Sequence, residues 1–145
     1  AFSPTDSSWT GAIGLMQVLT KTAQDFQITD LQNPENNLKA GTSYLAWLND
    51  YWFFIDDKSE RLKFILASYN VGYGHIQDAR RLTKKYGFDN EKWQNVEPYL
   101  LKKSNSKFYE DDVVKHGYCR GTEPVNYVKD ILNLFEHYKQ FMLEK

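Results

Sequence analysis

The sequence predicts an all-α domain of about six or seven helices with little or no sheet. Apolar residues recur at three- and four-residue steps through most of the 145 residues. Strand-like alternation is missing, apart from a few residues within 106–119 that could be extended. No repeat and no low-complexity linker interrupts the pattern, so we expect one domain over residues 1–145.

The first half of the chain contains the signals for two helices. A short helix is expected at about residues 18–27. Asn33-Pro34 marks the start of the next helix, because asparagine caps a helix and proline fits its first position. The apolar positions of this second helix are Leu38, Tyr44, Leu45, Leu48 and Trp52. Gly41 lies inside it at a cost of about 1 kcal/mol relative to alanine, which indicates the close approach of another backbone.

The second half predicts four further helices and a loop. Ser59 is expected to cap a helix that ends at Gly72-Tyr73-Gly74, where glycine permits left-handed backbone angles. The next helix should run from about His75 to Tyr86, and a short one should begin at Asp89. Residues 103–122 are predicted to be an irregular loop. Pro124 then opens a last helix with a long apolar stripe, made of Val128, Ile131, Leu132, Phe135, Tyr138 and Met142.

Composition excludes several classes of function. The net charge is −1 with both signs mixed, so no basic stripe indicates nucleic-acid binding. No apolar run approaches the length of a membrane span. Cys119 is the only cysteine, and His75, His116 and His137 are predicted to be scattered, ordinary histidines. We therefore expect neither a metal nor a cofactor.

The carboxylates offer no obvious catalytic acid. A general acid needs an apolar setting that raises its pKa. Glu123 is expected to cap or charge the last helix, and the other glutamates fall on polar faces or in first turns: Glu35, Glu60, Glu91, Glu97, Glu136 and Glu144.

Two motifs in a fixed order carry the strongest functional signal. Gly11-Ala12-Ile13-Gly14-Leu15-Met16-Gln17 comes first, and Ala67-Ser68-Tyr69-Asn70-Val71-Gly72-Tyr73-Gly74 follows it. Together they resemble the lytic transglycosylase (SLT, goose-lysozyme-like) family, which cleaves peptidoglycan glycan strands, and within it the membrane-bound F type. Further matching stretches are residues 3–5, 22–23, 33–38, 40–45, 75–83, 117–121 and 124–128.

The resemblance also implies where the catalytic acid belongs. In the family it is the glutamate of a Glu-Ser-x-aromatic-x-Pro-x-Ala-x-Ser segment, and Ala1-Phe2-Ser3 resembles the end of that segment. The glutamate is therefore expected upstream of Ala1, with the domain truncated before it. In a rival alignment, Asp6-Ser7-Ser8-Trp9 itself replaces Glu-Ser-x-aromatic, with Asp6 as a shorter substitute acid.

The resemblance implies a set of substrate-binding residues: Ser3, Met16, Gln17, Tyr69, Asn70, Tyr118 and Tyr127. Ser3 would stand near the acid, Met16 and Gln17 on the floor of a cleft, and Tyr69 and Asn70 against an acetamido group. Structural roles remain as alternatives for four of them. Met16 and Tyr127 suit a core, whereas Gln17 suits a turn hydrogen bond and Asn70 a helix cap.

By this resemblance the activity is cleavage of the MurNAc-β-1,4-GlcNAc bond with formation of 1,6-anhydroMurNAc. A lysozyme-like muramidase, a non-catalytic peptidoglycan-binding module and a helical protein-interaction domain stay open as alternatives. The substrate implies a bacterial cell envelope location, periplasmic and with the parent outer-membrane anchored. Parents of this type carry an upstream solute-binding-like domain.

Overall fold

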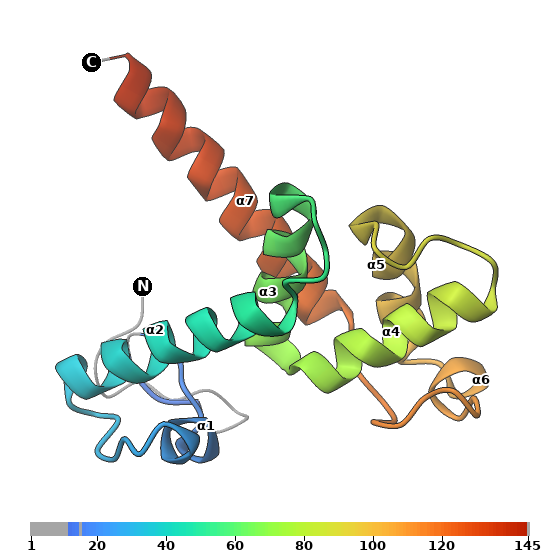
Figure 1. Cartoon of the computed structure of the whole chain (residues 1–145), viewed down its shortest axis with the longest axis horizontal. Coiled ribbons are helices and arrows are strands. Elements are labelled where there is room, and N and C mark those ends of the chain that lie inside the picture. The colour runs from blue at the N-terminus through green and yellow to red at the C-terminus, as the bar shows by residue number, and fades with distance from the viewer. Residues whose placement is uncertain (1–11, 15, 145) are drawn as a thin grey trace. The chain divides into compact units, whose positions relative to one another are not determined.

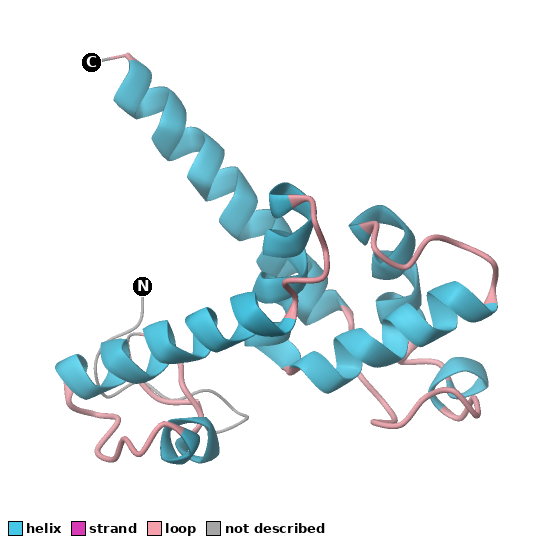
Figure 2. Ribbon diagram, viewed as in Figure 1, coloured by secondary structure: helices cyan, strands magenta, loops and turns pink. Residues whose placement is uncertain are grey.

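The computed structural model describes residues 12–14 and 16–144, and its regular structure is helical throughout that part of the chain (Figures 1 and 2). Seven helices are described, which confirms the all-α prediction: α1 Thr20–Asp25, α2 Pro34–Tyr51, α3 Lys58–Val71, α4 Tyr73–Lys85, α5 Trp93–Lys102, α6 Ser106–Tyr109 and α7 Thr122–Leu143. The chain divides into two compact units, one ending at Tyr51 and the next beginning at Trp52.

The first unit packs α1 against α2. Asn33 caps α2 as the sequence predicts, because its Oδ1 accepts hydrogen bonds from the backbone N–H groups of Glu35 at 3.0 Å and Asn36 at 3.2 Å. A small apolar cluster fills the space between the two helices and the preceding turn, and it consists of Val18, Ala23, Ile28, Leu31 and Ala40. This unit therefore has a core of its own.

Gly41 allows a close approach within the first unit, but of a different kind from the one predicted. A Cβ atom added at Gly41 would lie 2.7 Å from Cβ of Met16 and 2.8 Å from its Cγ. The neighbour is thus a side chain rather than another backbone. Any larger residue at position 41 would displace Met16 from the surface of α2.

The second unit is built around α3. This helix packs on α4 and on α7, and α4 packs on α5. Trp52 is fully buried, and its Nε1 donates a hydrogen bond of 2.9 Å to Oγ of Ser68. The ring centroids of Trp52 and Phe64 are 5.4 Å apart, and Trp93 meets Phe64 edge-on at the same distance. These aromatic contacts join the chain just before α3, α3 itself and the start of α5 in one core.

Several predicted helix boundaries are wrong by a few residues for identifiable reasons. α3 is capped by Asp57 and not by Ser59, because Oδ1 of Asp57 accepts the N–H of Glu60 at 3.0 Å. α4 begins at Tyr73 rather than at His75, because the single residue Gly72, with φ of 96°, ends one helix and starts the next. α5 begins at Trp93, after the predicted start at Asp89.

The stretch predicted to be irregular contains a short helix. α6 lies within residues 103–122, where the sequence shows too few apolar positions to reveal one turn of helix. Its cap is Asn105, whose side chain accepts the N–H of Lys107 at 3.0 Å.

Only the first part of the α7 stripe is covered. Val128 is buried, but the side chains of Phe135, Tyr138 and Met142 are 61%, 63% and 67% exposed. Within the second unit, α7 extends beyond the helices on which its N-terminal half packs (Figure 1). A regular apolar pattern therefore marks a face that can pack, and it does not guarantee that the face is covered.

Candidate functional site

Two of the predicted residues, Ser3 and Asp6, lie outside the described residues. The other predicted residues fall into two groups. Met16 and Gln17 belong to the first unit, whereas Tyr69, Asn70, Tyr118 and Tyr127 belong to the second.

Met16 and Gln17 lie in a tight turn before α1. Ile13 and Val18 exchange two backbone hydrogen bonds of 2.9 and 3.0 Å across it. Gly14 and Gln17 have φ angles of 79° and 50°, which is common for glycine and unusual for glutamine. The side-chain Nε2 of Gln17 donates a 2.8 Å hydrogen bond to the carbonyl of Gly14. The side-chain amide of Gln17 thus closes the turn, which is the structural alternative to substrate binding that the sequence leaves open for this residue.

Asn37 holds this turn against α2. Its side chain is fully buried, and its Oδ1 accepts the backbone N–H of Met16 at 2.7 Å. Its Nδ2 donates to the carbonyls of Ile13 at 2.6 Å and Leu31 at 2.9 Å. Asn37 does not stand out in the sequence. The sequence signal for it is an amide within a predicted helix, three residues before Ala40 and four before Gly41, where the small residues mark the packed face.

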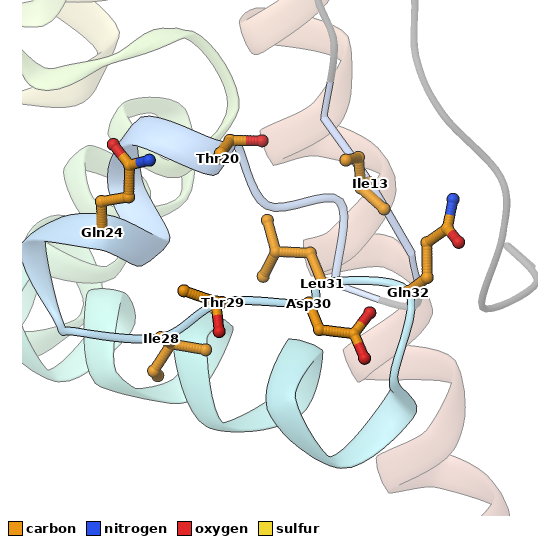
Figure 3. Close-up of a pocket in the computed structure, with 8 residues that line it drawn as sticks. All are labelled: Ile13, Thr20, Gln24, Ile28, Thr29, Asp30, Leu31 and Gln32. Carbon is orange, nitrogen blue, oxygen red and sulfur yellow. The ribbon is translucent and has the colours of Figure 1, made fainter.

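A hollow of about 280 Å³ lies in the first unit beside α1 and the segment that leads into α2 (Figure 3). Its lining residues are Ile13, Thr20, Gln24, Ile28, Thr29, Asp30, Leu31 and Gln32. None of them is a predicted substrate-binding residue. We therefore do not assign this hollow to the predicted site.

Tyr69 and Asn70 lie in the last turn of α3, directly before Gly72. Tyr69 is half-buried and Asn70 is exposed. The end of the helix is closed by the backbone N–H of Gly72, which donates to the carbonyl of Ser68 at 2.8 Å. The side chain of Asn70 makes no hydrogen bond within the described residues, so it does not cap α3 there. Its amide presents a donor and an acceptor at the surface.

Tyr127 lies in the second turn of α7, the helix that packs on α3. The residue is half-buried, and burial raises the pKa of its hydroxyl above the ordinary value. The phenol therefore stays protonated and can donate a hydrogen bond at neutral pH. Tyr118 lies in the segment between α6 and α7; it is 57% exposed, and its ring meets Tyr109 edge-on at 5.8 Å.

A buried ionic network supports the segment that carries Tyr118. Asp78 and Lys103 are both fully buried, and their charged groups are 2.7 Å apart. The Asp78 carboxylate also accepts a bond from Arg81 and 2.8 Å bonds from the backbone N–H groups of Lys115 and His116. The network thereby attaches residues 115–116, next to Tyr118, to α4 and α5.

The prediction of scattered histidines is wrong for two of the three. His75 on α4 and His116 in the segment between α6 and α7 have ring centroids 6.2 Å apart. Nδ1 of His75 also lies 2.8 Å from Nζ of Lys103. Lys103 is one of two adjacent lysines, and the two histidines are far apart in sequence, so no pattern in a single sequence reveals these contacts.

Asp78 is the buried carboxylate of the described residues, and its electrostatics do not suit a general acid. Burial alone would raise its pKa, but the hydrogen bonds from Lys103, Lys115, Arg81 and His116 outweigh burial and hold the pKa below the ordinary value. An acid that protonates a leaving group needs the opposite shift. Asp78 is therefore a structural anion.

We expect His75 to make stability depend on pH. Burial, and then the nearby Lys103 ammonium, lower the pKa of His75 from 6.5 to about 4. Between these two values the unfolded chain binds a proton that the folded chain does not, so stability falls as the pH drops from 6.5 to about 4. Denaturant unfolding across that range should show a steeper loss for the wild type than for His75→Gln.

The exposed His137 provides the control, because His137→Gln should leave the wild-type pH dependence in place. Asp78 does not confuse the comparison. Its pKa lies below 3.8, so its own loss of stability comes at lower pH. Parallel curves for the wild type and His75→Gln would show that His75 does not take its proton in this window.

Within the described residues, no group of three or more His, Cys, Asp or Glu side chains is arranged to hold a metal ion. Burial raises the pKa of the Cys119 thiol to about 11, so it is not a reactive thiolate. No helix in the described part of the chain has the length and apolar character needed to cross a membrane.

Comparison with known proteins gives one consistent result. Residues 1–92 match the family described as "Transglycosylase SLT domain". A "Membrane-bound lytic murein transglycosylase F" from Desulfosudis oleivorans is 41% identical over 139 residues, which cover 96% of this chain and 30% of that protein. A protein of the same name from Haemophilus influenzae strain PittGG is 39% identical over 90% of this chain and 27% of that protein. The one from Pasteurella multocida is also 39% identical, over 94% of this chain and 28% of that protein.

The chain thus spans less than a third of the length of these relatives. The family match covers both predicted motifs, and the identity to the Desulfosudis oleivorans protein extends into α7. On this evidence, together with the helical fold, the chain belongs to the SLT transglycosylase domain family.

Proposed function

We propose that this chain is part of a lytic transglycosylase that cleaves the MurNAc-β-1,4-GlcNAc bond of peptidoglycan and leaves a 1,6-anhydroMurNAc end. The observation that carries the proposal is the 41% identity to a lytic murein transglycosylase over 96% of the chain. The match includes the end of α3, where the exposed amide of Asn70 has no partner among the described residues.

The proposed chemistry uses one acid. A glutamic acid protonates the leaving oxygen, and the acetamido oxygen of the substrate stabilises the positive charge that develops at C1. The same carboxylate then accepts the proton of the C6 hydroxyl as that oxygen attacks C1. Attack from within the same sugar has a large effective concentration compared with attack by water. We place the glutamate in a Glu-Ser-x-aromatic segment upstream of Ala1, with Asp6 as the alternative.

The proposed roles of the other residues follow their settings. Asn70 binds an acetamido group through its exposed amide, with Tyr69 beside it in α3. The protonated hydroxyl of Tyr127 donates a hydrogen bond to the sugar or the acid. Met16 and Gln17 contact the glycan from the turn that Asn37 fixes. Ser3 and Tyr118 complete the set. Arg120, exposed beside Tyr118, pairs with a peptide carboxylate.

We further propose that the parent protein works in the bacterial cell envelope, at the periplasmic side, and that it carries an upstream solute-binding-like domain and an outer-membrane anchor. The relatives are named as membrane-bound enzymes, and peptidoglycan lies in that compartment.

The test is digestion of purified peptidoglycan by the full-length protein, with the products separated and weighed by mass spectrometry. Transglycosylation leaves anhydro ends, which are one water lighter than hydrolysed ends. We expect anhydro ends only. Hydrolysed ends would identify a lysozyme-like muramidase, and binding without products would identify a non-catalytic module.

Asn70→Ala and Tyr127→Phe should each lower kcat/KM on peptidoglycan by about tenfold or more, because each removes a hydrogen bond to a polar substrate. Asn49→Ala and Tyr138→Phe make the same chemical changes at exposed positions and should leave kcat/KM unchanged.

Replacing the expected glutamate by glutamine should abolish cleavage, whereas Asp6→Asn should not. The reverse result would assign the acid to Asp6.

A further inference from the structure

A second surface of the chain has the composition of a glycan-binding site. Four aromatic rings gather around α5 in the second unit, where α5 packs on both α4 and α6. Tyr99 lies at the centre. Its ring stacks on Tyr86 at 5.3 Å, and it lies 6.4 Å from Phe88 and 6.5 Å from Phe108. Tyr86 and Phe108 are 5.9 Å apart.

These rings are only partly buried in the core. Tyr99 is buried, but Tyr86 is 43% exposed and Phe88 is 55% exposed. One face of Tyr86 lies against Tyr99, so its exposed area belongs to the other face and the edge. Contiguous exposed rings supported from beneath by a buried ring form a rigid apolar surface, and such surfaces are uncommon without a binding partner.

Two lysines add positive charge to the same surface. Nζ of Lys102 lies 5.5 Å from the ring centre of Tyr99 and 5.2 Å from that of Phe108. Nζ of Lys107 lies 5.6 Å from Phe108. Both residues are exposed, and neither pairs with a carboxylate among the described residues. The nearby Lys85 differs, because Asp111 neutralises it at 2.5 Å.

The combination of exposed aromatic rings and lysine ammonium groups favours one kind of ligand. Aromatic faces pack against the apolar C–H faces of pyranose rings, and unpaired ammonium groups attract carboxylates. Peptidoglycan provides both, because its MurNAc sugars carry lactyl ethers with peptide stems that end in carboxylates. A neutral glucan would meet the rings but would bring no carboxylate to the two lysines.

We propose that Tyr86, Phe88, Phe108, Lys102 and Lys107, supported by Tyr99, form an accessory peptidoglycan-binding surface. It is distinct from the residues assigned to cleavage, and it rests on the proposed function for the identity of its ligand. Its role is to hold the polymeric substrate, so it contributes to binding of intact peptidoglycan and not to cleavage of short fragments.

The experiment measures two quantities for the full-length protein: co-sedimentation with intact peptidoglycan sacculi in the cold, and kcat/KM on short soluble glycan fragments. Tyr86→Ala combined with Phe88→Ala should weaken binding to sacculi by about tenfold. Lys102→Gln combined with Lys107→Gln should weaken it severalfold and reduce its sensitivity to salt. Both double variants should retain kcat/KM on the fragments.

Phe135→Ala combined with Tyr138→Ala is the matched control, because it also removes one phenylalanine and one tyrosine that are exposed on the second unit. It should bind sacculi like the wild type. Unchanged binding by the Tyr86 and Phe88 variant would overturn the proposal, as would an equal loss in the control. If the Tyr86 and Phe88 variant loses self-association but still binds sacculi, the proposal is also overturned. The surface is then an interface between copies of the chain. Failure of the wild type to bind or cleave would instead count against the proposed function.

Discussion

Replacing Lys103 by methionine is expected to lower the free energy of unfolding by about 3 kcal/mol. Breaking one side of a buried ion pair costs about 3–5 kcal/mol, because it leaves the partner charged in a place that water cannot reach. Here Asp78 keeps Arg81 and two backbone N–H groups as partners, so we expect the lower end of that range. Equilibrium denaturation in urea at neutral pH measures the change.

Lys139→Met is the control for this substitution. Lys139 is exposed on α7, so the same chemical change there should alter stability by no more than about 0.5 kcal/mol. A second readout is local. Since Asp78 holds the N–H groups of Lys115 and His116, Lys103→Met should also speed hydrogen exchange at these two amides. A stability loss below about 1 kcal/mol with unchanged exchange would show that the pair does not anchor the segment.

Replacing Asn37 by aspartate is expected to cost about 3–4 kcal/mol, although the two side chains have nearly the same shape. The amide Nδ2 donates to two carbonyls, those of Ile13 and Leu31. A carboxylate cannot donate, so two buried acceptors would lose their partner and a buried negative charge would face them. Stability should recover in part at low pH, where the carboxyl carries a proton.

Asn49→Asp tests the same chemical change at an exposed position on the same helix, where we expect a loss of no more than about 1 kcal/mol. Hydrogen exchange at the backbone amides of Met16 and Val18 reports whether the turn loosens. On the proposed function, Asn37→Asp in the full-length protein should also reduce peptidoglycan cleavage, because Met16 and Gln17 depend on this turn. A stable Asn37→Asp variant with protected turn amides would refute the anchoring role of Asn37.

The site was only partly predictable from the sequence. Short motifs predict Asn70 and Tyr127 as site residues, which stays a prediction; in the structure the amide of Asn70 is exposed and the phenol of Tyr127 is protonated. The motif that contains Gln17 does not reveal that its Nε2 closes a turn. Asn37, Asp78 and Lys103 were missed. Each is a polar residue whose partners lie 21 to 38 residues away, apart from Leu31 and Arg81.

By itself the sequence determined that this chain is helical, roughly where its helices lie, and which family it resembles. Those properties depend on local periodicity, on capping residues such as Asn33, and on short motifs that neighbouring residues define. Only the tertiary structure decided which polar groups are buried together and which part of the α7 stripe is covered. Burial and charge pairing arise between residues distant along the chain, and no local pattern encodes the partner that a buried lysine or amide will meet.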